Sequence, residues 1–296
     1  MAATNGHLVR LDGGVATELQ RAGLPVSPPW WTTAALVTEE KRRLLRGVHT
    51  DFLAAGAQVL TANTFRCNLR ALEPLGLDRA GLTWMVQAAV GVAAAARNAA
   101  GEPGTLIAGS MAPVEDCYRP DLTPPDDELR AEHRWLATEL MRAGADLILI
   151  ETMNTIREAR IALDEAQAAG GRAWVSFVCA SGGRLLSGEG VADAASVVEA
   201  GGAEVVLVNC TGLADTEESL RRIGEVCRCP IGAYPNLENR YRASGNGSLP
   251  AAASPDEFAT TLHRWHDDLG ASLLGGCCGT TPAHIAALRD RLDGHA

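Results

Sequence analysis

The chain has 296 residues, of which 47% are hydrophobic and 21% are charged, and its formal net charge is −10. These values are typical of a soluble globular protein long enough to bury a full core. The acidic balance argues against a nucleic-acid partner, which would need a basic patch. No apolar run approaches the roughly 18 residues of a membrane span. Residues 1–8 lack a secretory signal, so we expect a cytoplasmic protein whose eight cysteines stay reduced.

Short apolar runs alternate with helical patterns from one end of the chain to the other. The expected strands are, in order, Leu8–Asp12, Gln58–Ala62, Thr105–Ser110, Asp146–Glu151, Ala173–Cys179, Glu204–Cys210, Pro230–Tyr234 and Ala271–Gly275. The expected helices are Thr38–Ala55, Asp78–Ala100, Asp126–Ala143, Thr155–Ala169, Ala192–Ala200, Asp215–Cys227, Ser254–Leu269 and Thr281–Leu292. Two long polar or proline-rich segments, Pro113–Pro125 and Asn236–Ala253, are expected to be loops between a strand and a helix.

Several predicted strands are almost continuously apolar, as in Leu147–Ile150 and Val205–Val208. Such runs are typical of parallel strands that are covered by helices on both faces. Eight strand–helix units therefore predict a single-domain (β/α)₈ barrel that spans residues 1–296. A doubly wound open sheet is the alternative. It is disfavoured because Gly13-Gly14, after the first strand, does not match the Gly-x-Gly-x-x-Gly spacing of that fold.

Polar side chains recur at one place in each unit, the C-terminal end of the predicted strand. In a parallel barrel these ends form the rim where ligands bind. The rim residues are Asp12, Asn63, Ser110, Glu151, Asn209, Cys210, Tyr234, Asn236, Cys277 and Cys278. We therefore expect the functional site on this rim.

The three cysteines of this rim suggest a metal site. Cys277 and Cys278 lie within Gly275–Gly279, where flanking glycines permit backbone angles that could turn both sulfurs to one point. Cys210, at a neighbouring strand end, could complete a three-sulfur set. Soft thiolates select Zn²⁺ or Cu(I), and three protein ligands with an open position are typical of catalytic zinc.

Simpler interpretations of Cys277 and Cys278 are two small buried hydrophobes or a vicinal disulfide. The other five cysteines are interpreted as packing residues without a chemical role: Cys67, Cys117, Cys179, Cys227 and Cys229. A zinc ion held by three thiolates is a poor source of hydroxide but suits the binding of a further thiol, whose pKa it lowers. The chemistry this predicts is alkyl transfer to a substrate thiol.

The sequence resembles the zinc-dependent homocysteine S-methyltransferases, and the matching motifs occur in the order of that family over essentially the whole chain. They are Leu11-Asp12-Gly13-Gly14 with Thr17-Glu18-Leu19, Thr61-Ala62-Asn63-Thr64-Phe65, Gly109-Ser110-Met111-Ala112-Pro113, Glu151-Thr152, Val208-Asn209-Cys210-Thr211, Tyr234-Pro235-Asn236, and the block from Gly275 to Ile285. The Gly-Gly-Cys-Cys-Gly block with its upstream Asn-Cys is the most specific of them.

The resemblance implies a (β/α)₈ barrel with Cys210, Cys277 and Cys278 as zinc ligands and the sulfur of homocysteine in the fourth position. It also implies that Asp12 and Glu151 hold the amino group of the substrate. Backbone N–H groups near Gly13 and Ser110 are candidate anchors for its carboxylate, and Asn209 is counted with the substrate-binding residues.

The methyl donor would carry a cationic sulfonium or quaternary ammonium group, which aromatic faces attract. The candidate residues on the donor side are Trp30, Trp31, Asn63, Phe65, Tyr234 and Asn236. Glu151 is followed by Thr152 and not by the tyrosine of betaine-using members, which favours S-methylmethionine or S-adenosylmethionine. The segment Leu237–Arg240 departs from the small residue and glycine of the family, so the donor stays open between these and betaine.

The predicted function is methyl transfer to the zinc-bound thiolate of L-homocysteine, which gives methionine. One alternative keeps this chemistry with another thiol or a selenol as acceptor. An alternative of a different class is a non-enzymatic metal or redox sensor on a barrel scaffold. The expected partners are small molecules, without nucleic acid or membrane.

Overall fold

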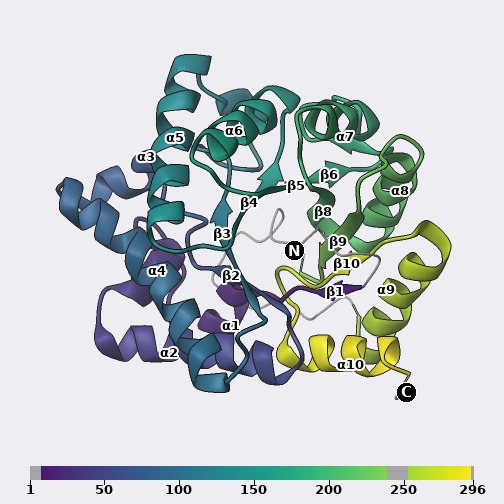
Figure 1. Ribbon diagram of the computed structural model, residues 1–296, viewed down its shortest axis with the longest axis horizontal. Coiled ribbons are helices and arrows are strands. Elements are labelled where there is room, and N and C mark those ends of the chain that lie inside the picture. Colours follow the sequence, from purple (N-terminus) through teal and green to yellow (C-terminus); the bar gives the residue numbers. More distant parts are fainter. Residues whose placement is uncertain (1–7, 239–252, 295–296) are drawn as a thin grey trace.

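Eight parallel strands form a nearly closed barrel in the computed structural model, which describes residues 8–238 and 253–294 (Figure 1). The hydrogen-bonded order is β1-β10-β9-β8-β5-β4-β3-β2, and a bridge between Leu11 and Val59 joins the two ends. The strands are β1 (Val9–Arg10), β2 (Val59–Ala62), β3 (Leu106–Met111), β4 (Leu147–Met153), β5 (Ala173–Phe177), β8 (Val205–Gly212), β9 (Ile231–Asn236) and β10 (Leu273–Leu274). The predicted barrel is confirmed, and the open sheet is excluded.

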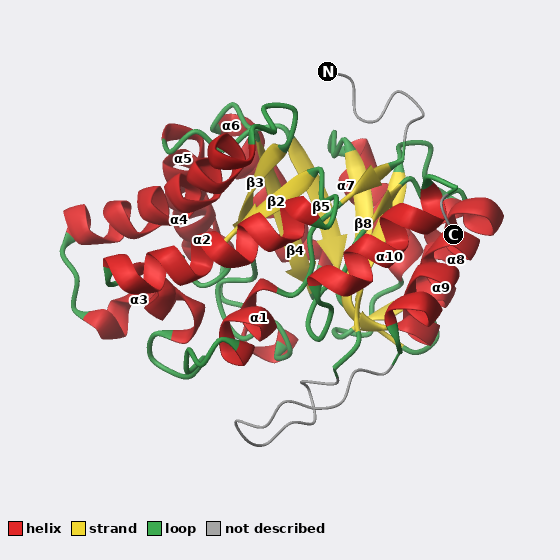
Figure 2. Cartoon of the chain, turned by 90° about the horizontal axis from the view of Figure 1, so that it is seen from below, coloured by secondary structure: helices red, strands yellow, loops and turns green. Residues whose placement is uncertain are grey.

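Helices surround the barrel on the outside (Figure 2). They are α1 (Val15–Arg21), α2 (Glu39–Ala54), α3 (Leu69–Leu72), α4 (Arg79–Ala100), α5 (Asp126–Arg142), α6 (Ile156–Ala168), α7 (Val191–Ala200), α8 (Leu213–Gly224), α9 (Pro255–Leu269) and α10 (Pro282–Leu292). The side chains of Thr38, Asp78 and Thr155 accept the N-terminal N–H groups of α2, α4 and α6. Such caps explain why the predicted starts of these three helices fall within one residue of the observed ones. Of the described residues, none forms a helix long and apolar enough to cross a membrane.

The first unit of the barrel differs most from the sequence prediction. Between β1 and α2 the chain forms α1 and a 3₁₀ helix, η1 (Trp31–Leu36), neither of which was predicted. Both are too short for their hydrophobic period to be recognised. The predicted strands Leu8–Asp12 and Ala271–Gly275 are also reduced to two residues each in β1 and β10.

Two loop regions can be compared with the prediction. Pro113–Pro125 has no strand and only the 3₁₀ turn η3 (Pro120–Leu122), in agreement with the predicted loop. The predicted loop Asn236–Ala253 falls for the most part outside the described residues. The predicted strand Ala173–Cys179 is divided, because β5 ends at Phe177 and a separate antiparallel hairpin follows, of β6 (Cys179–Ala180) and β7 (Arg184–Leu185).

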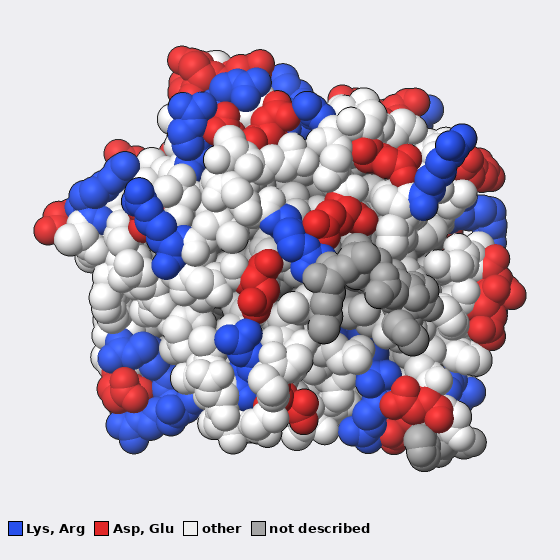
Figure 3. Space-filling model, viewed as in Figure 1, with Lys and Arg blue, Asp and Glu red and all other residues white. Residues whose placement is uncertain are grey.

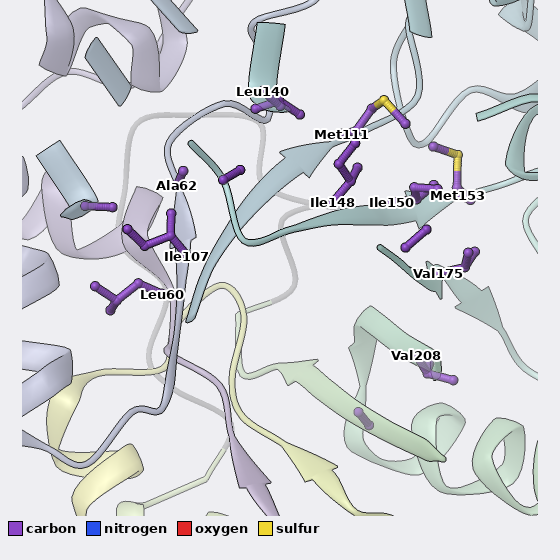
Figure 4. Packing of buried hydrophobic residues seen from close by; sticks show 14 of the residues in the cluster. Leu60, Ala62, Ile107, Met111, Leu140, Ile148, Ile150, Met153, Val175 and Val208 are labelled. Carbon is purple, nitrogen blue, oxygen red and sulfur yellow. The ribbon is translucent and has the colours of Figure 1, made fainter. Parts of the chain in front are cut away.

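The core has two layers, and the two-residue period of the strands assigns side chains to them. Leu147, Leu149, Val205 and Leu207 belong to a cluster that is built mainly from inward-facing strand residues and fills the barrel. The alternate strand residues point outward and pack against the helices (Figure 4). They include, near Leu140 of α5, Leu60, Ala62, Ile107, Met111, Ile148, Ile150, Met153, Val175 and Val208. The inward rows of β4 and β8 continue at their ends to Glu151 and Asn209.

The face seen down the barrel carries mixed charge. Lys and Arg side chains alternate with Asp and Glu over the described residues of this face (Figure 3). A nucleic-acid site would gather cations on one surface. The described residues of this face do not gather cations in that way.

Candidate active site

A cavity of about 980 Å³ opens at the C-terminal ends of the strands. This volume suits one or two small molecules. Most of the sequence-predicted residues line it: Asp12, Gly13, Trp31, Asn63, Phe65, Ser110, Glu151, Cys210, Tyr234, Cys277 and Cys278. The predicted rim site therefore coincides with a real cavity.

Two buried carboxylates lie in this cavity. Asp12 accepts hydrogen bonds from the backbone N–H and the hydroxyl of Thr61, at 2.7 and 2.8 Å. Glu151 accepts from the hydroxyl of Ser110 and from Tyr234 Oη at 3.1 Å. Burial raises the pKa of each carboxyl group to about 7, although these hydrogen bonds lower it in part.

Neither carboxylate has a cationic partner among the residues that the structure describes. Over residues 8–238 and 253–294, no Lys, Arg or His side chain forms an ion pair with Asp12 or Glu151. Each charge also raises the cost of ionising the other, since Glu151 contributes to the raised pKa of Asp12. The pair is therefore suited to receive a cationic group from a ligand, such as an amino group.

Two residues at the strand ends have left-handed backbone angles that are uncommon outside glycine. Thr152 has φ +61° and Cys210 has φ +52°, and the strand register shifts at both places. By regular alternation Cys210 would point outward, because Asn209 continues the inward row. The left-handed turn instead brings the sulfur of Cys210 to 3.6 Å from Thr152 Oγ1, inside the rim. Irregularities of this kind commonly re-aim a side chain at a functional site.

Asn209 connects the carboxylate to the cysteine from beneath the cavity. Its Oδ1 accepts from the backbone N–H of Thr152 at 2.9 Å and from Ser176 Oγ at 2.7 Å, which fixes the amide plane. Its Nδ2 then lies 3.4 Å from both Glu151 Oε2 and Cys210 Sγ. Asn209 is fully buried and does not line the cavity. One nitrogen thus holds the carboxylate and the sulfur a fixed, short distance apart.

The cysteine block is held by backbone contacts to its neighbours. The N–H of Cys277 donates to Pro235 O at 2.9 Å, and the N–H of Cys278 donates to Asn236 Oδ1 at 3.0 Å. Asn236 therefore supports the block from outside the cavity lining. Cys277 Sγ lies 3.1 Å from Cys210 Sγ, and Cys278 lines the same cavity.

The glycines before this block act differently from the prediction. Gly275 and Gly276 do not have the left-handed angles expected of them; of the flanking glycines only Gly279 does, with φ +88°. The first two are needed for close packing. A Cβ on Gly275 would lie 2.7 Å from Leu11 Cβ, and one on Gly276 would lie 2.3 Å from Thr280 Oγ1. Space, more than backbone freedom, requires glycine there.

The donor set of this site suits a soft metal ion. Three thiols gather at one end of the cavity, and thiolates select ions such as Zn²⁺. The pKa of Cys277 lies well above its ordinary value because the thiol donates to Cys210 and is buried. The three sulfurs do not all lie within 4.8 Å of one another. Tetrahedral zinc would place them about 3.8 Å apart.

The cavity lining beyond the thiols includes two aromatic rings and Arg66. The guanidinium of Arg66 lies 5.3 Å from the ring centre of Trp31 and 5.4 Å from that of Phe65. Arg66 forms no ion pair with any carboxylate of the described chain. Trp30, in contrast, does not line the cavity and packs half-buried against the outer core.

The remaining predicted donor-side residues have structural contacts of their own. Asn63 lines the cavity but donates from Nδ2 to Thr32 O at 2.9 Å, and Tyr234 donates to Glu151. The sequence prediction missed the roles of Thr61, Thr152 and Arg66. All three lie within or next to motifs quoted for the family. Their position beside the rim residues was the sequence feature from which a role in the site could have been predicted.

The closed barrel and its rim cavity define the class of protein, a (β/α)₈-barrel enzyme that acts at the C-terminal ends of its strands. The comparison with protein families makes the assignment specific. A model of the homocysteine S-methyltransferase family matches residues 9–292, and the chain belongs to this family.

Curated relatives agree over nearly their full length. The chain is 33% identical to the homocysteine S-methyltransferase of Escherichia coli, over 96% of this chain and 95% of that one. It is 30% identical to the homocysteine S-methyltransferase YbgG of Bacillus subtilis, over 94% and 92%. A selenocysteine Se-methyltransferase of Brassica oleracea is 28% identical, over 98% and 90%.

A solved structure shows the same architecture. The metallated form of the homocysteine methyltransferase MmuM from Escherichia coli superposes with a TM-score of 0.83 at 30% identity, and the match covers 96% of each chain. The barrel, its closure and its unit order are thus shared with an enzyme whose structure is described as carrying a metal.

Proposed function

We propose that this protein transfers a methyl group from a sulfonium donor to the thiolate of L-homocysteine, giving methionine, with Zn²⁺ held by Cys210, Cys277 and Cys278. The observation that carries the proposal is a cavity that combines the thiols with two buried carboxylates, neither of which has a cationic partner among the described residues. An amino acid with a side-chain thiol offers a complementary partner to each. Membership of the family supports the same reaction.

The distance between the two ends of the site supports homocysteine as acceptor. Glu151 and Cys210 are both contacted by Nδ2 of Asn209 at 3.4 Å, so a ligand bridging them must be short. Homocysteine separates its amino nitrogen from its sulfur by three carbon atoms. In the proposed pose Asp12 and Glu151 receive the ammonium group, and the sulfur points at the cysteines. The backbone near Gly13 and Ser110 is the proposed anchor for the carboxylate.

When bound, Zn²⁺ would lower the pKa of the acceptor thiol, so that the sulfur is deprotonated yet still nucleophilic at neutral pH. The residues of the chain do the positioning. Asn209 fixes Glu151 relative to Cys210, and Thr61 fixes Asp12. Loss of its methyl group turns the cationic sulfonium donor into a neutral thioether, which needs no proton to leave. The reaction therefore needs alignment of donor and acceptor more than acid catalysis.

The donor side supports an amino-acid sulfonium, S-methylmethionine or S-adenosylmethionine. Both carry a carboxylate beside the cationic centre. Arg66, held over Trp31 and Phe65 without a carboxylate partner, is the proposed receptor for that group. The sulfonium would then lie against a ring face of Trp31 or Phe65, both of which line the cavity. Thr152, where betaine-using members have tyrosine, agrees with this choice.

A selenol acceptor is the second candidate, and the similarity to the Brassica selenocysteine Se-methyltransferase favours testing it. Selenocysteine is one methylene shorter than homocysteine, so it would bridge the same two ends less well. We place the reaction in the cytoplasm, because a thiolate site needs a reducing compartment and all eight cysteines are free thiols.

The test is a donor panel with purified, zinc-loaded protein and L-homocysteine, read by methionine formation over many turnovers. We expect methionine from S-methylmethionine or S-adenosylmethionine and little from betaine. Selenocysteine and cysteine are run as competing acceptors. The variant Arg66→Met should raise the KM of the donor and leave that of homocysteine unchanged.

Each cysteine is then replaced by serine at positions 210, 277 and 278, and Cys179→Ser, outside the cavity, serves as the matched control. We expect loss of the zinc ion at the cavity, and of activity, in the first three variants alone. Stoichiometric zinc without turnover on any donor would contradict the enzyme and favour the sensor. Full activity in any of the three serine variants would remove that residue from the site.

A further inference from the structure

A second group of thiols lies at the opposite end of the barrel from the cavity. Cys227 and Cys229 belong to the short segment between α8 and β9, where strand β9 begins. Glu199 comes from the last turn of α7. All three side chains are half-buried, so that solvent reaches them. The sequence gave no reason to join them, because 28 residues or more separate Glu199 from either cysteine.

Their ligand atoms converge. One carboxylate oxygen of Glu199 and the sulfurs of Cys227 and Cys229 all lie within 4.8 Å of one another, and no other such group of three occurs in the described parts of the chain. The Oε1 of Glu199 accepts the N–H groups of Arg228 and Cys229 at 2.7 and 2.6 Å. The carboxylate is therefore anchored to the very segment that carries the thiols. A carboxylate has about four acceptor sites, so these two bonds leave capacity for a further ligand.

The composition of the group specifies its chemistry. Two thiolates and one carboxylate form a sulfur-rich, anionic set that suits Zn²⁺ and disfavours Mg²⁺ and Ca²⁺, which take oxygen ligands. Around a tetrahedral ion the three ligand atoms would lie between about 3 and 4 Å apart. This separation is compatible with the upper limit of 4.8 Å that the structure gives for these atoms. A disulfide between Cys227 and Cys229 would use the sulfurs but give Glu199 no role.

We propose that Glu199, Cys227 and Cys229 form a second zinc site, separate from the cavity, that ties the end of α7 to the start of β9. In (β/α)₈ barrels the end where the strands begin serves stability and the other end serves catalysis. By that placement the ion would stabilise the fold and take no part in the reaction at the cavity. The site does not depend on the function proposed for the cavity.

The experiment counts zinc in the full-length protein after loading and removal of free metal. Cys227→Ser/Cys229→Ser should hold one zinc ion fewer per chain than the unaltered protein and should keep its methyl transfer. Cys210→Ser should retain the zinc ion at Glu199, Cys227 and Cys229, here called the distal ion. With Co²⁺ in place of zinc, this Cys210→Ser protein should still show the sulfur-to-cobalt absorption of a thiolate site. Cys179→Ser, a thiol outside both groups, is the matched control and should change neither count.

A third variant guards against misfolding of the double variant. Glu199→Gln keeps an oxygen that can accept the two N–H groups but removes the anionic ligand, so zinc affinity at this site should fall at least about tenfold. Zinc should also raise the melting temperature of the Cys210→Ser protein, and Glu199→Gln should reduce that rise.

Two outcomes overturn the proposal. One is an unchanged zinc count in the variant that lacks both Cys227 and Cys229. The other is that thiol titration of freshly purified protein finds these cysteines joined as a disulfide, while zinc binds only at the cavity. Failure of the function proposed for the cavity would give a different result. The distal ion would still be bound, while no donor would support methyl transfer.

Discussion

The role of Glu151 can be tested by replacing it with glutamine, which keeps the size of the side chain and removes the charge. The carboxylate accepts from Ser110 and Tyr234 and has no cationic partner in the described chain. If it binds the ammonium group of homocysteine, Glu151→Gln loses a charged hydrogen bond worth about 1.5–3 kcal/mol. This corresponds to a fall in kcat/KM for homocysteine of roughly 10- to 150-fold, at 1.36 kcal/mol per tenfold change.

The pH dependence gives a second signature. Burial raises the pKa of Glu151 to about 7, so in the free enzyme the carboxyl group is protonated below that pH and cannot hold an ammonium. The KM of homocysteine should therefore rise as the pH falls from 8 to 6 in the unaltered protein. Glu151→Gln should weaken this dependence, and Asp12 should account for what remains.

The assay is steady-state kinetics with each substrate varied in turn, and Glu139→Gln is the matched control. Glu139 lies on α5 away from the cavity and, like Glu151, is 6% exposed. We expect the control to keep the KM of homocysteine. Equal increases in the KM of donor and acceptor, or a fall in kcat alone, would refute the assignment of Glu151 to the amino group.

Three further predictions concern stability and packing. In metal-free protein the pKa of Asp12 is raised from 3.8 to about 7, so its stabilising contribution is present below pH 4 and is lost as the pH rises through 7. Asp12→Asn should therefore increase the free energy of unfolding at pH 8 by up to about 4 kcal/mol, and with it the melting temperature, but should have no such effect at pH 4. Scanning calorimetry at both pH values measures this, and an equal effect at both would contradict it. Gly14→Ala would place a Cβ 2.4 Å from Thr17 Oγ1 and 2.6 Å from the carbonyl oxygen of Cys277, so we expect about 1–3 kcal/mol of destabilisation and weaker zinc binding, measured by denaturation and metal competition. Gly47→Ala, on the exposed side of α2 where no atom lies within 4 Å of the new Cβ, should stabilise by about 0.5–1 kcal/mol with unchanged zinc affinity; destabilisation there would contradict the packing argument.

Sequence patterns alone determined the architecture and the members of the site. The apolar runs around Leu147 and Val205 have the length and composition of strands covered on both faces, and this property depends on local composition only. Eight such runs that alternate with helical patterns favour a barrel over an open sheet, and a barrel places its strand ends on one rim. The residues that follow these strands, such as Asp12, Glu151 and Cys277, could therefore be assigned to one site before any contact was known.

Tertiary structure decided how those residues are aimed and which additional ones take part. Alternation along β8 would turn Cys210 outward, and only the left-handed backbone at that residue brings its sulfur into the cavity. Arg66 stands over Trp31 and Phe65 because two loops meet there. The physical reason is that a local pattern fixes the period of a strand, while a bulge or a stacked guanidinium is stabilised by partners far away in the chain, whose positions exist only once the barrel has closed.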